Sequence, residues 1–359
     1  MNAYYMLATC VGTYLGPVAA GYVVESQGWR WIWWWCVILF GVQLLLIVFC
    51  FEESKFSASV LVSQAAPQDA ADEEAAAAAT GLDKTISQGM HRTPSHRFID
   101  QRIPARPYRE RMALVTVSDG PTFGNPLDAV RALFTFPAIS YTAITFGSIL
   151  ALLAILTSVQ AAYMFGPPYY FSASGVGLMN LAPFVGSIPG AYIGGYLNDR
   201  CIVWLSKRNG GVYEPEMRLW FVLPAAVLAP ASVLMMGLGI YYGLPWPILA
   251  VGFGLFGVVL AGAGSIALSY AMDCYGEVIG TAMIGIIFTR NVLAVGVLFA
   301  LDPWIEAIGL CNFHIIIAVL MVVVLLLPLP LLKWGKRARV RSAKAYTSMA
   351  RRLPTFRES

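Results

Sequence analysis

In this 359-residue chain, hydrophobic stretches as long as whole helices alternate with polar stretches. Long apolar runs with almost no charge are separated by short polar segments, and each run reaches the ~20 residues that a helix needs to cross a hydrocarbon core. The sequence predicts eight such crossings, at residues 3–24, 31–51, 138–165, 176–198, 219–241, 246–271, 278–300 and 313–333. We therefore expect an all-α membrane protein.

The composition supports this class and argues against an enzyme. Hydrophobic residues make up 58% of the chain and charged residues 12%, whereas a soluble domain carries about 25% charge. The six cysteines are scattered without paired spacing, which favours packing roles over a disulfide or a metal site. No glycine loop for nucleotide phosphates, no nucleophile elbow and no metal-ligand cluster is present in the sequence. We expect no cofactor and no metal, and transport driven by a gradient.

Lysine and arginine are concentrated on one side of the predicted crossings. The segment 52–136 has nine, the loop 199–218 has four and the tail from Lys333 has nine, together 22 of the 24. The positive-inside rule then places both termini and the long loop in the cytoplasm. We expect the plasma membrane rather than a vacuolar or other internal one. The basic tail is interpreted as a topology anchor next to the lipid bilayer, with no nucleic-acid partner.

The crossings are divided by the long polar segment into two and six. We expect residues 1–51 to be the last two helices of an N-terminal bundle and 52–136 a disordered cytoplasmic linker. Residues 137–334 would form a six-helix C-terminal bundle, and 335–359 a basic cytoplasmic tail. The linker is either a solvated tether or rests on anionic headgroups through its arginines. Six helices after a long cytoplasmic loop are typical of the second half of a six-plus-six transporter.

The first predicted helix carries the pattern G-x-x-x-G-P-x-x-A-G, formed by Gly12, Gly16, Pro17, Ala20 and Gly21. Small residues spaced four apart let helix backbones approach closely in lipid, and the proline bends the helix. The segment resembles the antiporter signature in the fifth helix of drug:proton antiporters of the major facilitator superfamily, with alanine in place of the usual glycine at position 20.

A second motif ends the fourth predicted helix, with Gly195, Leu197, Asp199 and Arg200 in the run GYLNDR. It resembles the superfamily's G-x-L-x-D-R loop motif and occurs where the second half of the family fold has it. A carboxylate at a helix end can pair with a guanidinium or with a neighbouring helix N-terminus. The resemblance implies that Asp199 is a latch of a cytoplasmic gate.

The resemblance implies a major facilitator fold whose eight helices are equivalent to helices 5 to 12 of twelve, from an N-terminally truncated chain. The loop 208–219 and the FEES sequence at 51–54 resemble a fungal multidrug or polyamine-type branch. The implied function is proton-coupled secondary transport of small organic solutes, drug- or polyamine-like, by alternating access. Eight helices alone are not expected to transport. The alternative is a non-transporting regulatory half-transporter that associates with full-length relatives; a channel is disfavoured because no charged ring or filter sequence occurs.

Polar residues inside the predicted helices are the candidate site. Arg290 lies near the middle of the seventh helix, where a charge costs about 3 kcal/mol even on the lenient insertion scale. It is either a cavity-lining cation that pairs with an anion or carboxylate during transport, or one partner of a structural pair within the bundle. Asp273 and Glu277 are gate candidates or merely solvated helix ends. The remaining candidates for substrate contact are Gln160, Tyr163 and Asn180.

Two rows of small residues recur every four positions in the fourth and sixth predicted helices. They are Gly186, Gly190 and Gly194, and Gly257, Ala261 and Ser265. Each row leaves one helix face nearly bare. We interpret them as close helix packing, which is compatible with a surface on which helices slide during transport.

Overall fold

The computed structural model describes residues 2–51, 126–276 and 278–350. Residues 1–36 and 122–353 belong to one compact unit, and residues 37–121 with 354–359 to another. The first unit is a bundle of long helices. Of the second unit, the structure describes the greater part of helix α2.

The described residues are almost entirely helical. The elements are α1 (Asn2–Gln27), α2 (Arg30–Cys50), α5 (Pro126–Thr135), α6 (Pro137–Tyr163), α7 (Ala173–Met179), α8 (Leu181–Tyr192), the π-helix η2 (Ile193–Leu197), α9 (Asn198–Arg208), the 3-10 helix η3 (Pro215–Val222), α10 (Ala225–Tyr241), α11 (Trp246–Cys274), α12 (Ile279–Ile308), α13 (Leu310–Leu325) and α14 (Pro328–Ala350). Eight helical stretches among them are long and apolar enough to cross a membrane. This number agrees with the eight predicted crossings.

Part of the segment predicted as the linker is helical in the structure. Residues 126–135 form α5, which packs against α12 with Ala129 and Ala132 buried. The backbones meet closely, because a Cβ on Gly285 would lie 2.9 Å from the Ala129 carbonyl oxygen. The segment has apolar residues at helical spacing, a local signal that is lost when the whole polar stretch is averaged. The predicted linker residues 52–125 lie outside the described part of the chain.

The two rows of small residues pack against each other in the bundle core. A Cβ on Gly186 would collide with the backbone of Gly254, and one on Gly190 would lie 2.6 Å from the Val258 carbonyl oxygen. A Cβ on Gly257 would likewise collide with the α8 backbone. Lipid gives helices no hydrophobic drive to associate, so close backbone contact of this kind holds α8 on α11. The packing interpretation is confirmed, and sliding stays a hypothesis.

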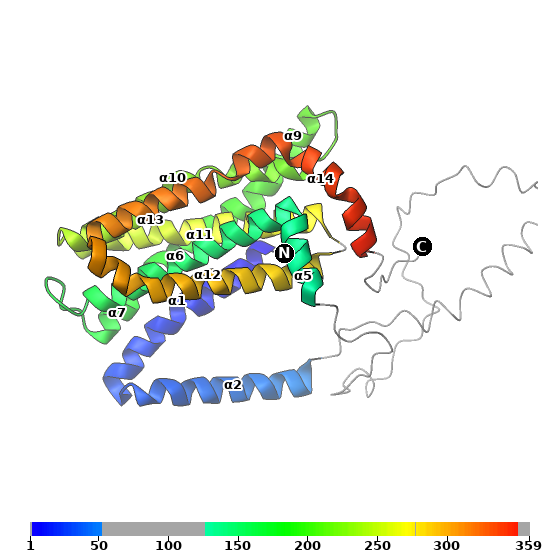
Figure 1. Cartoon of the computed structure of the whole chain (residues 1–359). Helices are drawn as coiled ribbons and strands as arrows, with labels where there is room; N and C mark the ends of the chain where they lie inside the picture. Colours follow the sequence, from blue (N-terminus) through cyan, green and yellow to red (C-terminus); the bar gives the residue numbers. More distant parts are fainter. Residues whose placement is uncertain (1, 52–125, 277, 351–359) are drawn as a thin grey trace, which may run out of the picture. The chain divides into compact units, whose positions relative to one another are not determined.

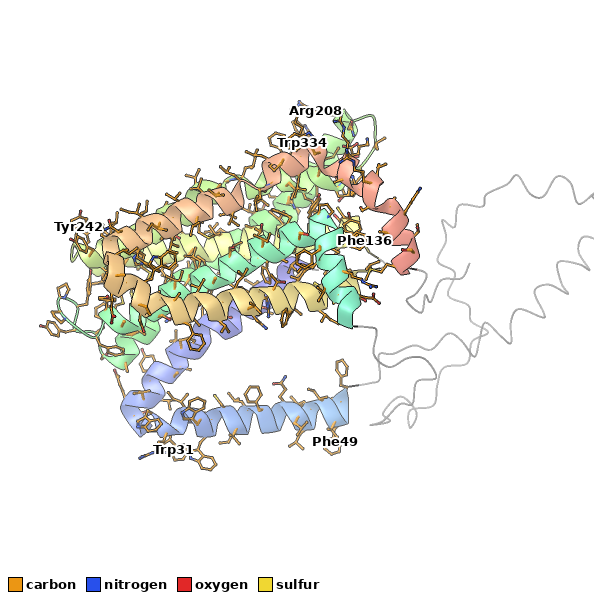
Figure 2. The ribbon with its side chains drawn as sticks, in the orientation of Figure 1. Trp31, Phe49, Phe136, Arg208, Tyr242 and Trp334 are labelled. Atoms are coloured by element: carbon orange, nitrogen blue, oxygen red, sulfur yellow. The ribbon has the colours of Figure 1, made fainter. Side chains whose placement is uncertain are left out.

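The bundle has two distinguishable ends. Phe136, Arg208 and Trp334 lie at one end and Tyr242 at the other (Figure 2). Helices α5 and α14 lie at the first end (Figure 1), which we call the Asp199 end. The opposite end, where α6 and α12 finish, is called the Tyr163 end.

Candidate functional site

One guanidinium, that of Arg218 on η3, joins two carboxylates at the Asp199 end. Its Nη1 lies 3.1 Å from Asp199 Oδ1 and its Nε 2.5 Å from Asp273 Oδ2. Asp199 is in the first turn of α9 and Asp273 in the last turn of α11. The side chain of Arg218 is only 17% exposed, so its charge needs partners. The structure thus brings together the predicted latch and one predicted gate residue through a cation that the prediction did not single out.

Tyr213 completes this cluster from the loop before η3. Its hydroxyl donates to Asp273 Oδ2 at 2.5 Å. Burial, and then the hydrogen bond to Asp273, raise the pKa of Tyr213 to about 12, so the phenol keeps its proton at neutral pH. Asp273 therefore accepts two donors, one of them charged, and such charge-assisted bonds are the stronger kind. We call Asp199, Tyr213, Arg218 and Asp273 the Arg218 network.

The other motif residues lie beside the network rather than in it. Gly195 and Leu197 belong to the π-helix η2, and π-helical turns often occur at functional sites. The guanidinium of Arg200 lies over the Tyr196 ring, 5.1 Å from its centroid. The motif therefore contributes its aspartate to the network, but its arginine packs on the motif's own helix. Glu277, the second gate candidate, lies outside the described residues.

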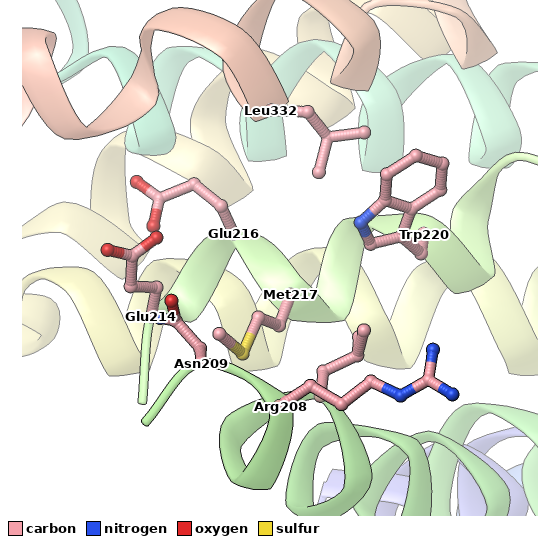
Figure 3. A pocket seen from close by; sticks show the side chains of 8 residues that line it. Arg208, Asn209, Glu214, Glu216, Met217, Trp220 and Leu332 are labelled. Carbon is pink, nitrogen blue, oxygen red and sulfur yellow. The ribbon is translucent and has the colours of Figure 1, made fainter. Parts of the chain in front are cut away.

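A hollow of about 330 Å³ opens on the other side of η3. Glu214 and Glu216 form one side of it, and Arg208 and Trp220 another (Figure 3). The two carboxylates are already paired with cations of α14. The acidic part of the lining thus already belongs to ion pairs, and we assign no substrate to this hollow.

A larger cavity of about 760 Å³ lies at the Tyr163 end between α6 and α12. Tyr163, Asp302 and Glu306 contribute polar groups to a lining that is otherwise mainly apolar. Neither carboxylate forms an ion pair with any residue that the structure describes. A cavity of this size is in the range of small-molecule sites, and Tyr163 is one of the residues that line it.

The structure does not bring the other two predicted contact residues to this cavity. Gln160 is buried and donates from Nε2 to the Val176 carbonyl oxygen at 2.8 Å. Asn180, at the break between α7 and α8, donates to the same oxygen at 3.2 Å and to that of Gly177 at 3.3 Å. Both amides satisfy a backbone carbonyl where a helix is interrupted. Gln160 thereby links α6 to α7, whereas the bonds of Asn180 stay within α7 and its C-terminal end.

Arg290 packs in the α6–α12 interface. A Cβ on Gly147 would lie 3.2 Å from the Arg290 Cα, so the two helix backbones are close there. The guanidinium lies over the Phe146 ring, 5.6 Å from its centroid, and its buried Nε has no hydrogen-bond partner in the described structure. A desolvated cation–π contact is worth about 2 kcal/mol. Neither expected ion pair, with a cavity anion or within the bundle, is present among the described residues.

Residues 1–300 match the model of the Major Facilitator Superfamily. The chain belongs to this superfamily. It is therefore an integral, multi-pass membrane protein of a transporter family, and members of that family are not enzymes.

Named relatives come from fungi. An uncharacterized MFS-type transporter of Schizosaccharomyces pombe is 30% identical over 366 residues, which cover 95% of this chain and 63% of the relative. Protein HOL1 of Saccharomyces cerevisiae is 25% identical over 387 residues, with 95% and 65% covered. The probable efflux pump mfs2 of Aspergillus flavus is 25% identical over 344 residues, with 95% and 74% covered. The chain spans less than two thirds of the length of the first two relatives. No solved structure matches it significantly.

In this superfamily member the motif of α1 divides into a packed and an open half. A Cβ on Gly21 would lie 2.6 Å from the α7 backbone, and one on Gly177 of α7 would lie 2.8 Å from the Pro17 carbonyl oxygen. Ala20 is half-buried. Gly12 and Gly16 instead face open space in the described structure. The second half of the motif therefore fixes α1 on α7, as small residues at helix contacts do.

Arg218 and Tyr213 are site residues that the motifs in the sequence did not point to. Both occur in the loop that signalled a fungal branch, where acidic and basic residues alternate in Glu214, Glu216 and Arg218 directly before an apolar helix. Such charges next to a membrane helix are usually solvated. The alternating charges were the available signal that these residues form ion pairs, because charges that become buried need partners.

Proposed function

We propose that this protein is a secondary active transporter of small organic solutes, drug- or polyamine-like, that works by alternating access and is coupled to protons. The observation that carries the proposal is the difference between the bundle ends. The Arg218 network joins three elements at the Asp199 end, while α6 and α12 border an open cavity at the Tyr163 end. Alternating access requires that one side is closed while the other admits the solute.

The charge distribution assigns a direction to these ends. Under the positive-inside rule the Asp199 end would lie in the cytoplasm. The network would then be the inner gate, and the cavity would open outward. Tyr163, Asp302 and Glu306 would favour a cationic solute, since two unpaired carboxylates attract cations into a cavity. One relative is named a probable efflux pump, which supports transport of a solute across the membrane, and the resemblance of α1 to the antiporter signature supports drug-like substrates and proton coupling.

The test is transport in proteoliposomes. Three preparations are compared. They are the chain alone, the part of the S. pombe relative that lies outside its match with this chain, and the two reconstituted together. Radiolabelled spermidine and a cationic dye are offered with and without a pH gradient. We expect gradient-dependent transport in the combined preparation that a protonophore abolishes. Transport of neither solute in any preparation would contradict the proposal.

The open half of the α1 motif favours a second candidate, a half-transporter that regulates full-length relatives. Gly12 and Gly16 present a bare face of the kind that helices use to associate in lipid. Co-purification of a full-length relative, reduced by Gly12→Val with Gly16→Val, together with absent transport in all three preparations, would favour this candidate. Val11→Leu, at an exposed position of α1 directly before the motif, is a control for α1 substitutions in general.

A further inference from the structure

Helix α14, which follows the last apolar segment, is tied to the element that carries Arg218. Arg339 donates from Nε and Nη2 to the two carboxylate oxygens of Glu216, at 2.9 and 2.7 Å. The Glu216 side chain is 7% exposed, and Glu216 precedes Arg218 by two residues on η3. A bidentate pair fixes orientation as well as distance. The position of η3 is thus constrained by α14.

A second contact with α14 holds the residue directly before η3. Lys336 Nζ lies 2.6 Å from Glu214 Oε1, and Glu214 directly follows Tyr213 of the network. Gly335 lets the two elements approach, because a Cβ there would lie 2.8 Å from Glu216 Oε1. The loop that supplies both donors of the network, Tyr213 and Arg218, is therefore held by consecutive turns of α14.

A third contact with α14 is made next to Asp273, the acceptor of the network. The hydroxyls of Tyr275 and Ser342 are 3.1 Å apart and hydrogen-bonded. The Tyr346 ring packs at 5.8 Å from Tyr275 and at 6.4 Å from Phe136, measured between centroids. Tyr275 follows Asp273 by two residues, so the turn that presents the shared carboxylate also rests on α14.

We propose that α14 is a clamp that positions the Arg218 network, with Glu216 and Arg339 as its positioning residues. Donor and acceptor of the bond between Arg218 and Asp273 each lie within two residues of a contact with α14. Removing Arg339 leaves the buried Glu216 charge unpaired, and a carboxylate in that position turns toward water. The movement of η3 that follows would lengthen both bonds of Arg218. The functional meaning of the clamp rests on the proposed gate, but its geometry can be tested without transport.

The opposite face of α14 supplies matched controls. Arg337, Arg341 and Lys344 are exposed and form no ion pair with any residue that the structure describes. Their charges equal that of Arg339, and they lie on the same helix. A substitution there changes net charge and helix propensity without touching Glu216.

The experiment is hydrogen–deuterium exchange of the full chain in lipid nanodiscs, read at residues 198–203 of α9. This segment carries Asp199, which pairs with Arg218 and with no residue of α14 that the structure describes, so it reports the network. We expect exchange there to rise about tenfold in Arg339→Gln and in Glu216→Gln, because each variant removes the bidentate ion pair and leaves its other group, buried Glu216 or half-buried Arg339, without its charged partner. Arg339→Lys, which keeps the charge but not the bidentate geometry, should give a smaller rise. Arg341→Gln should leave the exchange unchanged.

Arg218→Gln, measured in parallel, separates the clamp from the gate. If Arg218→Gln raises exchange at 198–203 and Arg339→Gln does not, the clamp is refuted while the network stands. If Arg218→Gln has no effect, the network itself does not hold α9 and both ideas fail. Should Arg339→Gln not yield folded protein, Gly335→Ala presses a methyl group against Glu216 and carries the same expectation. Unchanged exchange in Gly335→Ala would overturn the clamp.

Discussion

The two ends of the bundle use the same residue types in opposite ways. At the Asp199 end, Asp199 and Asp273 share one guanidinium. At the Tyr163 end, Asp302 and Glu306 border a cavity of about 760 Å³ and form no ion pair in the described part of the chain. Paired carboxylates close a surface, and unpaired ones at a cavity mouth can meet a solute. Under the proposed function, closure and access would lie at different ends of one bundle.

Burial distinguishes the two bonds of Arg218 as well. Asp273 is 26% exposed and also accepts from Tyr213, whereas Asp199 is 66% exposed. An exposed ion pair contributes about 0 to 1 kcal/mol, and a desolvated one is costly to break. The bond to Asp273 should therefore carry most of the energy of the network, and the bond to Asp199 should be the one that opens easily.

The largest effect is expected from disrupting the packing of α8 on α11, on which both ends of the bundle depend. Gly257→Val would drive α11 away from the α8 backbone, where even a Cβ collides. We expect the loss of monodisperse folded protein in size-exclusion chromatography, since backbone cannot shift as a side chain can. Gly12→Val is the matched control on an open glycine and should purify like the parent. Normal behaviour of Gly257→Val would contradict the packing described here.

The next effect separates the two carboxylates of the network. Asp273→Asn should lower the free energy of unfolding by about 2 kcal/mol, because it weakens a partly buried bond to Arg218. Asp199→Asn should cost less than about 1 kcal/mol, as exposed pairs do. Thermal unfolding in the same detergent measures both. Equal losses, or a larger loss for Asp199→Asn, would be inconsistent with the burial argument.

A smaller effect is expected from the phenol of Tyr213. Tyr213→Phe removes one hydrogen bond and should cost about 1 kcal/mol. The pKa of Tyr213 is raised from 10 to about 12, so the protonated phenol stabilises the fold fully below pH 10, and this contribution is lost as the pH rises through 12. The difference between parent and variant should hence be constant from neutral pH up to about pH 9. A difference that changes within that range would mean that Tyr213 is not the group that donates to Asp273.

The smallest effect is expected at the Tyr163 end. Asp302→Asn with Glu306→Gln should weaken spermidine binding by about threefold at low salt and less at 0.5 M salt, because exposed charges are screened. Equilibrium dialysis with labelled spermidine measures this. Asp128→Asn, which removes an acidic group of α5 at the other end, is the control. Equal binding by all three proteins would remove the argument for a cationic solute.

The sequence predicted what depends on local pattern. The eight crossings follow from apolar runs, and Asp199 from a short motif at a helix end. Arg218 could not be paired in advance, because its partners are 19 and 55 residues away and only the folded bundle joins them. Likewise, helical spacing shows which residues share a helix face, but it does not show what that face packs against. Gln160 and Asn180 were therefore expected at a cavity, whereas in the structure they donate hydrogen bonds to backbone carbonyls. The domain boundaries and the proton coupling stay predictions.

The central claim is that the Arg218 network keeps the Asp199 end closed while the Tyr163 end is open. It is tested by maleimide labelling in lipid vesicles of two single cysteines, native Cys201 beside Asp199 and an introduced Tyr163→Cys, with the other cysteines removed. We predict that Arg218→Gln speeds labelling of Cys201 and slows labelling at position 163, because opening one end closes the other. Unchanged labelling at both positions, or faster labelling at both, would contradict the account.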